Sequence, residues 1–480
     1  MKSVNIFKAF TSIFFGLLLV LSATSASVQD SFAQDANQPD RRAGRGGDQG
    51  GRSDERGERP ARGDRGASGE RGTNERDERG ERGERGERGE RGERGERQGR
   101  GGAEGANEKP TPAPKQVEPL SADERAKKLK TAKENAIAFL KVKQADNGSW
   151  AASPRSGIGP TAIILAGLLK NGVAPSDPVI TKGLKFLEGA IQKEGGIYSS
   201  AHFQNYETSV AILAFAAAND AIKKAEKKDK GTYDALLANG QKALIGQQYA
   251  EGRNVDKDDP RYGGLGYGGE TRPDLSNTQF FLDALTATGK KSDDPAIQKA
   301  LVFVSRNQNL ESEHNKLPFA SKNQDGGFIY TSTTGSSSAG QTESGGLRSY
   351  ASMTYAGLKS MIYAGLTKDD KRVKAAYDWI TKNYSVVENP GMGQRGLFYY
   401  YHTMSKALDV MGVNEIEDGN GKKHDWRAEL TDQLLSYQKT DGSWINEASP
   451  QWMENDPHLV TGFVLLVLAN DANLAKDTKN

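Results

Sequence analysis

Side chains that could bind a ligand or transfer a proton stand beside the first residues of strongly apolar segments. Carboxyl and imidazole groups could act as acids or bases, and the candidate catalytic residues are Asp274, His402, Glu207 and Asp456. The candidate binding residues are Tyr206, Asn277, Tyr350, Tyr355, Phe398, Tyr399, Tyr400, Trp452 and His458. Aromatic faces stabilise cations and pack against elongated apolar ligands. Aromatic walls flanked by acids and histidine equally suit sugar stacking and acid–base catalysis, and a third interpretation is that the aromatics simply fill the core.

Two kinds of helical segment alternate along the chain and would position these side chains. Amphipathic segments, with apolar residues at spacings of three and four, cover 124–142, 178–193, 233–248, 295–308, 373–384 and 426–438. The second kind is apolar on nearly all sides, and helices of that kind are buried. These segments cover 161–169, 208–218, 278–289, 354–365, 402–412 and 461–469.

The regular alternation of the two kinds predicts a repeat architecture. Six amphipathic helices outside and six apolar helices inside fit an all-α fold, an (α/α)6 toroid or barrel of six helix-hairpin repeats. An open solenoid is the alternative, but it would need polar end caps that the sequence lacks. Asp177 and Asp294, each before a proline, predict helix starts. Glycines that follow the apolar segments predict helix ends; they are Gly172, Gly289, Gly365 and Gly412.

Three short motifs near the ends of amphipathic segments resemble the QW repeats of terpenoid cyclases of the squalene-hopene cyclase type. They are QADNGSW (Gln144 to Trp150), QDGGF (Gln324 to Phe328) and QKTDGSW (Gln438 to Trp444). The resemblance, which extends to protein prenyltransferase β subunits and covers about residues 122–475, implies an (α/α)6 barrel. It also implies that each motif ties an outer helix to the next inner one. Glutamine could bond a free backbone N–H at a helix start, while glycine allows the turn.

The acid motif of class II terpenoid cyclases, DxDDTA, is degenerate in this chain. The corresponding stretch is PDLSNT, in which Asp274 and Thr278 match, but Ser276 stands in the place of the proton donor and Asn277 replaces the third acid. A serine hydroxyl is too weak an acid to start carbocation formation. Another acid cluster, DKDD at Asp256 to Asp259, is interpreted as a solvated loop. The alternatives are a catalytic acid displaced from the usual motif or a divalent cation site.

The zinc site of protein prenyltransferases is incomplete in the same way. His402 in YYYHT matches the zinc-binding histidine implied by the resemblance, but LRSYAS, from Leu347 to Ser352, holds neither the Asp nor the Cys ligand. Catalytic zinc needs three protein ligands. We therefore expect no cofactor and no zinc, and we expect His402 to be a hydrogen-bonded residue of the cavity wall, a ligand contact or a proton carrier.

Composition excludes several classes of protein. The chain of 480 residues has no cysteine, so disulfides, thiolate nucleophiles and Cys-ligated zinc are ruled out. Its 65 basic and 63 acidic side chains leave a formal net charge of +2, which gives no case for nucleic acid as a partner.

The N-terminal quarter of the chain predicts export and disorder. Lys2 and Lys8 precede an apolar run at 13–21 and a run of small residues, the layout of a signal peptide cleaved near Ala26 or Ala33. The run is shorter than the ~20 residues of a spanning helix, so we expect no transmembrane segment in the mature chain and a periplasmic or extracellular location. Residues 34–120 form a Gly/Arg/Glu-rich arm and a proline linker that cannot bury a core, which leaves 121–480 for the toroid. Through its arginines the arm could contact a protein or an anionic surface.

The sequence leaves three functions open. The leading hypothesis is an exported cyclase-like toroid whose cavity binds an isoprenoid or similar apolar small molecule, with or without catalysis by a non-standard acid. A non-catalytic binding or scaffold module is the second. The third is a polysaccharide lyase or glycosidase on a convergent toroid, because sugars are accessible outside the cell. The sequence does not decide whether the protein is an enzyme; it matches neither a standard DxDD class II cyclase nor a standard zinc prenyltransferase.

Overall fold

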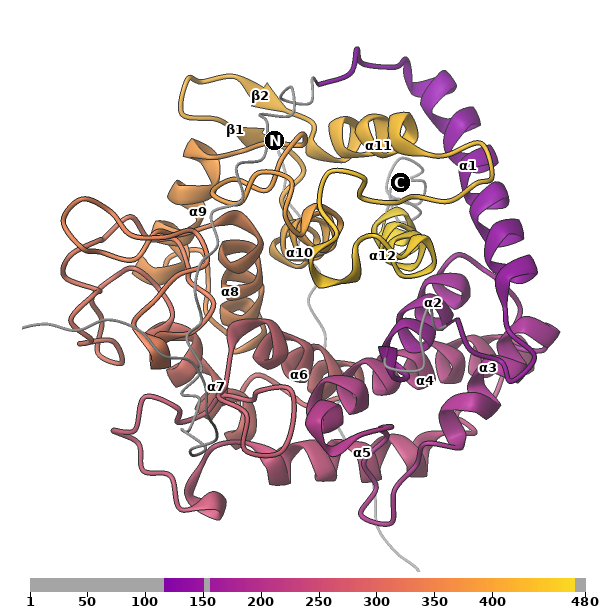
Figure 1. Cartoon of the computed structure of the whole chain (residues 1–480), viewed down its shortest axis with the longest axis horizontal. Coiled ribbons are helices and arrows are strands. Elements are labelled where there is room, and N and C mark those ends of the chain that lie inside the picture. Colours follow the sequence, from indigo (N-terminus) through magenta and orange to yellow (C-terminus); the bar gives the residue numbers. More distant parts are fainter. Residues whose placement is uncertain (1–115, 151–155, 471–480) are drawn as a thin grey trace, which may run out of the picture. The chain divides into compact units, whose positions relative to one another are not determined.

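The computed structural model describes residues 116–150 and 156–470, and in this part of the chain the helices run in two rings (Figure 1). The outer ring contains α1 (Ala122–Lys143), α3 (Pro178–Glu188), α5 (Asp234–Gln247), α7 (Pro295–Arg306), α9 (Lys371–Lys382) and α11 (Trp426–Tyr437). The inner ring contains α2 (Gly159–Lys170), α4 (Gln204–Glu226), α6 (Leu275–Ala287), α8 (Ala351–Tyr363), α10 (Leu397–Met411) and α12 (Pro457–Asn470). A two-residue antiparallel pair, β1 (Ile416–Glu417) and β2 (Lys423–His424), precedes α11. Single 3-10 turns lie at Ala201–Phe203, Glu251–Arg253, Ser332–Thr334 and Gln451–Met453.

Both rings close on themselves. Each inner helix packs against the inner helices before and after it, and α12 returns to pack against α2. In the outer ring α1 meets α11, where the Arg125 Nε donates to Asp432 Oδ1 at 2.7 Å. The Gln438 side-chain amide of the turn after α11 donates to the Ala132 carbonyl oxygen of α1 at 2.9 Å. These contacts confirm the predicted fold class, an all-helical closed toroid.

The predicted helix boundaries carry the expected caps. The Asp177 carboxylate accepts the Val179 N–H at 3.0 Å, and the Asp294 carboxylate accepts the Ala296 N–H at 2.9 Å. Both helices then begin at a proline, whose missing N–H costs nothing in the first turn. The glycines predicted to end inner helices adopt positive φ angles; they are Gly172, Gly289, Gly365 and Gly412.

A recurring glutamine joins neighbouring outer helices. The Gln144 amide donates to the Gly148 carbonyl oxygen at 3.0 Å and to the Val179 carbonyl oxygen of α3 at 2.9 Å. Gln438 makes the equivalent pair of bonds to Gly442 and α1. The predicted hydrogen bond from a free backbone N–H to this glutamine was wrong. The side-chain amide instead donates to two carbonyl oxygens.

Two further glutamines make the same kind of contacts but were not predicted from the sequence. Gln248 donates to Gly263 and to Ala296 of α7, and Gln308 donates to Gly326 and to Arg372 of α9. The residue in the structural position of the motif QDGGF is therefore Gln308 rather than Gln324. A loop separates Gln308 from its glycine and hides the pattern.

The motif tryptophan ties the turn to helices on both sides. The Trp150 indole N–H donates to the Leu140 carbonyl oxygen of α1 at 2.7 Å, while its backbone N–H donates to Thr161 Oγ1 of α2 at 3.1 Å. Trp444 repeats both contacts, with Leu434 of α11 and Thr461 of α12. The first turns of the inner helices are thereby fixed to the outer ring.

The predicted signal peptide and nearly all of the arm lie outside the described residues. The described residues belong to one of two compact units in the chain, Gly102–Asn480. Among them, no helix combines the length and the apolar character that a membrane crossing requires.

Candidate functional site

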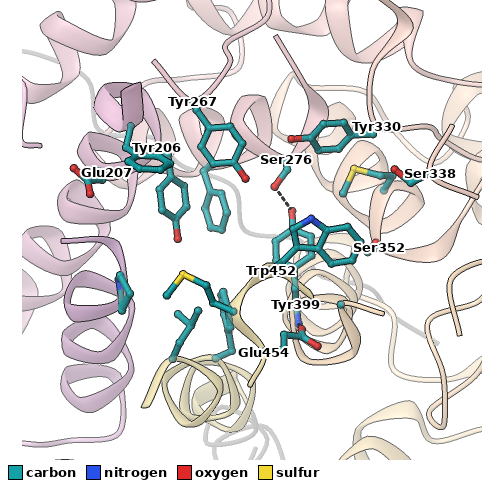
Figure 2. A pocket seen from close by; sticks show the side chains of 18 of the residues that line it. Tyr206, Glu207, Tyr267, Ser276, Tyr330, Ser338, Ser352, Tyr399, Trp452 and Glu454 are labelled. Carbon is teal, nitrogen blue, oxygen red and sulfur yellow. Dashed lines mark hydrogen bonds between the residues drawn. The ribbon is translucent and has the colours of Figure 1, made fainter. Parts of the chain in front are cut away.

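A cavity of about 540 Å³ opens among the N-terminal ends of the inner helices. Its wall is mainly aromatic and aliphatic in surface, and its polar groups are the hydroxyls of four serines and five tyrosines, two carboxylates and one arginine. Figure 2 shows these side chains converging from separate inner helices and from the loops that precede them. The lining residues include Phe203, Tyr206, Glu207, Tyr267, Arg272, Ser276, Phe280, Tyr330, Ser338, Tyr350, Ser352, Met353, Tyr399, Trp452, Met453, Glu454, Leu459 and Phe463.

Some of the residues singled out from the sequence line this cavity and others do not. Those in the wall are Tyr206, Glu207, Tyr350, Tyr399 and Trp452. Those outside the wall are Asp274, Asn277, Tyr355, Phe398, Tyr400, His402, Asp456 and His458. The cavity thus brings together one of the four expected acid–base residues and four of the nine expected binding residues.

The first residue of α10 sets which of its side chains face the cavity, and this explains why several predicted residues do not line it. The helix begins at Leu397, five residues before the expected start at His402, so neighbouring aromatics point in different directions. Tyr399 faces the cavity, whereas the Tyr400 hydroxyl donates to the Ser385 carbonyl oxygen at 2.6 Å. Tyr355 packs on Tyr400, and Phe398 packs on Tyr437 of α11. These three rings belong to the packing between helices.

His402 lies behind the wall instead of in it. Its ring stacks at 6.3 Å on Phe280 and lies 5.5 Å from Phe463, and both phenylalanines line the cavity. Burial, with the nearby positive charge of Lys359, lowers the pKa of His402 to about 3. The imidazole is therefore neutral at ordinary pH. In the described part of the chain, no three His, Asp or Glu side chains gather as a metal site would require.

Asp456 and His458 serve the start of α12. The Asp456 carboxylate accepts the His458 backbone N–H at 2.9 Å, an arrangement typical of a helix N-cap. The His458 ring stacks on Phe139 of α1 at a centroid distance of 5.7 Å. Asp456 thus caps an inner helix and His458 packs against the outer ring, and neither side chain lines the cavity as expected.

Asp274 caps α6 from a buried position next to the cavity. Its two carboxylate oxygens accept the Asn277 backbone N–H at 2.8 Å and the Asn277 side-chain amide at 2.7 Å. Burial raises the pKa of Asp274 to about 6, although these bonds and one from the Tyr330 hydroxyl oppose the shift. Tyr330 lines the cavity and also bonds to Tyr267. Asp274 therefore reaches the cavity only through a tyrosine hydroxyl.

The two carboxylates of the wall cap helices that lack a cap of their own. Glu207 accepts the Ile158 N–H at the start of α2 at 2.9 Å and the Ser199 N–H at 2.6 Å. Glu454 accepts the Tyr399 N–H in the first turn of α10 at 2.8 Å and the Asn446 side-chain amide at 2.7 Å. Burial raises the pKa of Glu207, and it raises the pKa of Glu454 to about 7. Their primary bonds are to backbone amides.

Trp452 stands at the rim of the cavity in a strained backbone conformation. Trp452 and Met453 have φ angles of 55° and 64°, a region that bulky side chains rarely adopt. The Trp452 side chain lines the cavity, yet the residue is 55% exposed. Strain of this kind is often found at ligand-binding sites, and Figure 2 shows the indole beside Tyr399 and Glu454.

The raised pKa of Glu454 predicts a stability that falls as pH rises. Its carboxyl group is harder to ionise in the folded protein than in the unfolded chain, so stability is greatest below pH ~4.5 and decreases through pH ~7. We expect Glu454→Gln to remove this dependence. Relative to wild type, the unfolding free energy of the variant should therefore rise by about 3 kcal/mol between pH 4 and pH 8. Urea denaturation across this range measures it.

The matched control for this experiment is Glu447→Gln, which changes an exposed carboxylate of the same loop. It gives the baseline for exchanging a carboxylate for an amide at the surface of this loop. A flat pH profile for Glu454→Gln would contradict the raised pKa of Glu454.

The wall residues that sequence reasoning missed come mostly from loops. Tyr267 and Tyr330 precede α6 and α8, and Glu454 lies three residues before α12 between two residues that were chosen. Ser338 belongs to the polar insertion between α7 and α8. Among these loop residues, only Glu454 could have been expected from the sequence, because it lies beside Trp452.

Comparison with known proteins gives distant structural likeness only. No family model and no curated protein matches the chain. Among solved structures, a variant of the type II terpene cyclase MstE from Scytonema is 12% identical, with 74% of this chain and 100% of that chain covered and a TM-score of 0.46. A glycosidase variant in complex with glucose is 12% identical, with 74% and 99% covered and a TM-score of 0.45. Likeness this distant carries no inference about ligand or reaction.

Proposed function

We propose that the toroid binds an elongated apolar molecule of the isoprenoid type in the cavity among its inner helices. The observation that carries the proposal is the composition of the wall, in which aromatic and aliphatic side chains such as Phe280, Phe463 and Leu459 outnumber the polar ones. A cavity of several hundred Å³ with a largely apolar surface is typical of a small-molecule site.

The two carboxylates of the wall make glycoside hydrolysis the weaker proposal. A glycosidase uses a pair of carboxyl groups, one to protonate the leaving group and the other to attack or activate water. Glu207 and Glu454 instead accept backbone N–H groups at the starts of α2 and α10. The hydroxyl groups of the wall could bond to a sugar, but most of the wall surface is hydrocarbon and aromatic.

Acid catalysis in the cavity would fall to Glu454 and not to Asp274. Glu454 lines the cavity and its pKa of about 7 keeps a proton available near neutral pH. Such an acid is too weak to protonate an alkene, so any reaction would involve a more basic group on the ligand. Binding without turnover is the primary proposal.

We also propose that the chain is exported through its first 33 residues, that residues 34–120 form a flexible arm, and that the toroid is built of six helix-hairpin repeats. The proposals on export and on the arm are supported by the apolar run at 13–21 and by the scarcity of large apolar residues in the arm. Full-length protein purified from its own export compartment would give both tests. Its intact mass reports cleavage near Ala26 or Ala33, and mass spectrometry of its organic extract reports a bound lipid.

Binding of farnesol, measured by calorimetry on the full-length protein, tests the cavity directly. We expect Phe280→Leu to weaken farnesol affinity about tenfold, because part of the aromatic wall is removed. Phe215→Leu is the matched control, since Phe215 is a buried phenylalanine of α4 that does not line the cavity. Equal affinities in both variants, or binding of a soluble oligosaccharide in place of farnesol, would reject the proposal.

A further inference from the structure

A chain of hydrogen bonds runs from the cavity wall into the core between α6, α8 and α10. Ser276 Oγ lies 2.8 Å from the Tyr399 hydroxyl, which is 3.2 Å from the Gln279 side-chain amide. The Gln279 amide oxygen contacts the Lys359 Nζ, which lies 2.5 Å from Asp283 Oδ2. Ser276 and Tyr399 line the cavity, while Gln279 and Lys359 are fully buried. Figure 2 shows the Ser276–Tyr399 bond at the wall.

The buried end of the chain fixes the orientation of Gln279. An ammonium group can only donate hydrogen bonds, so the group of Gln279 that meets Lys359 is its carbonyl oxygen. The amide nitrogen of Gln279 must then face Tyr399 and donate to it. Asp283 holds Lys359 in place, and burial, which alone would raise the pKa of Asp283, is outweighed by the positive charges of Lys359 and Lys406 together with the hydrogen bond from Lys359. The orientation is therefore set by an ion pair.

That orientation leaves one acceptor for the Tyr399 hydroxyl proton. The Tyr399 oxygen accepts from Gln279, and Ser276 Oγ is the one acceptor within hydrogen-bond distance of the Tyr399 hydroxyl among the described residues. We therefore assign the bond as Tyr399 donating to Ser276, which keeps its own O–H proton. The Ser276 hydroxyl has no other hydrogen-bond partner in the described part of the chain, and the side chain is half-buried in the cavity wall. In this assignment the serine proton is left to point into the cavity.

We propose that Ser276 is a hydrogen-bond donor to an oxygen atom of the ligand, so that the cavity selects an oxygenated isoprenoid over a hydrocarbon of the same length. The inference rests on the proposed function and adds to it the chemical class of the ligand. The acceptor is a carbonyl, ether or hydroxyl oxygen, placed beside Tyr399. A ligand without such an oxygen leaves the serine proton unbonded in an apolar site, which lowers its affinity.

Farnesal and farnesene form a matched pair of probes for this donor. They share a carbon chain of the same size, but farnesal ends in an aldehyde oxygen that can only accept hydrogen bonds. By calorimetry on the full-length protein, we expect wild type to bind farnesal about fivefold more tightly than farnesene. Ser276→Ala should reduce this preference, with farnesene affinity unchanged or improved, because the remaining Tyr399 proton belongs to a hydroxyl positioned for the serine and not for the ligand. Ser360→Ala, which removes a buried hydroxyl of α8 outside the wall, should keep the wild-type preference.

A second variant tests the direction of the chain and not just the presence of the serine. In Gln279→Glu both carboxylate oxygens accept, so Tyr399 would donate to the new glutamate and Ser276 would donate to Tyr399. Ser276 would then offer only lone pairs to the cavity, and the fivefold preference for farnesal should disappear although Ser276 is intact. A residue with a purely structural role would not change this ratio.

The outcomes separate the inference from the proposed function. Binding of neither probe to wild type would overturn both. Binding of both probes with equal affinity to wild type, or an unchanged preference in Ser276→Ala, would overturn the serine donor and leave the apolar cavity standing. If Gln279→Glu fails to fold, as a thermal melt would show, the Ser276→Ala comparison decides alone.

Discussion

Replacing Lys359 with methionine should lower the free energy of unfolding by about 3–5 kcal/mol. The Lys359 side chain is completely buried in α8, and its ammonium lies 2.5 Å from the equally buried Asp283 carboxylate of α6. Methionine has a similar length but no charge, so the variant leaves a carboxylate without its counter-ion in the core. Equilibrium urea denaturation of the full-length protein measures the change.

The double variant Lys359→Met with Asp283→Leu is the decisive control. Removing both charges leaves no uncompensated ion, and replacement of a whole buried pair by apolar residues is often neutral. The double variant should therefore recover most of the lost stability, with a small residual cost because the Tyr363 hydroxyl, which donates to Asp283 at 3.1 Å, loses its acceptor. A single variant as stable as wild type would show that the pair is not ionised in the fold.

Gly263→Ala should be the second severe variant, with a loss of about 3–5 kcal/mol in unfolding free energy. Gly263 has a φ of 87°, and a Cβ at this position would lie 1.8 Å from the Lys299 carbonyl oxygen of α7. The residue cannot move away easily, because its own carbonyl accepts the Gln248 amide at 2.8 Å. Urea denaturation measures the loss.

Gly289→Ala separates the two parts of that effect. Gly289 has nearly the same φ, 86°, but a Cβ there would meet nothing within 4 Å. The substitution should cost about 1–2 kcal/mol from backbone conformation alone. The difference between the two variants measures the steric conflict with α7, and equal losses would show that the helix yields to the added methyl group.

The fold was predictable because its signals are local and repeated. The apolar segments, the Asp–Pro starts and the motifs at Gln144 and Gln438 all depend on residues within a few positions of one another. The glutamines of the same function at Gln248 and Gln308 were missed, since their glycines follow 15 and 18 residues later instead of four. Loop insertions leave the spatial contact intact while they destroy the spacing.

The site was predicted less well, because it depends on helix phase. One residue of error in a helix start turns a side chain by about 100°, and Tyr399 and Tyr400 differ by just that step between the cavity wall and the interhelical packing. Tyr330 and Glu454 enter from loops whose paths no periodicity describes. The acidic residues near helix starts were expected to be catalytic, and in the structure Asp274, Asp456 and Glu207 accept backbone N–H groups at helix starts.

The closed seam of the toroid also affects how the chain reaches its fold. Arg125 and Asp432, joined at this seam, are 307 positions apart, and α2 packs against α12, the last helix of the ring. Contacts this distant in sequence slow folding. A growing chain must complete nearly the whole domain before α2 can cover all of its apolar surface, so a molecule shortened by α12 alone would leave α2 and α10 each without one of their two inner-ring neighbours.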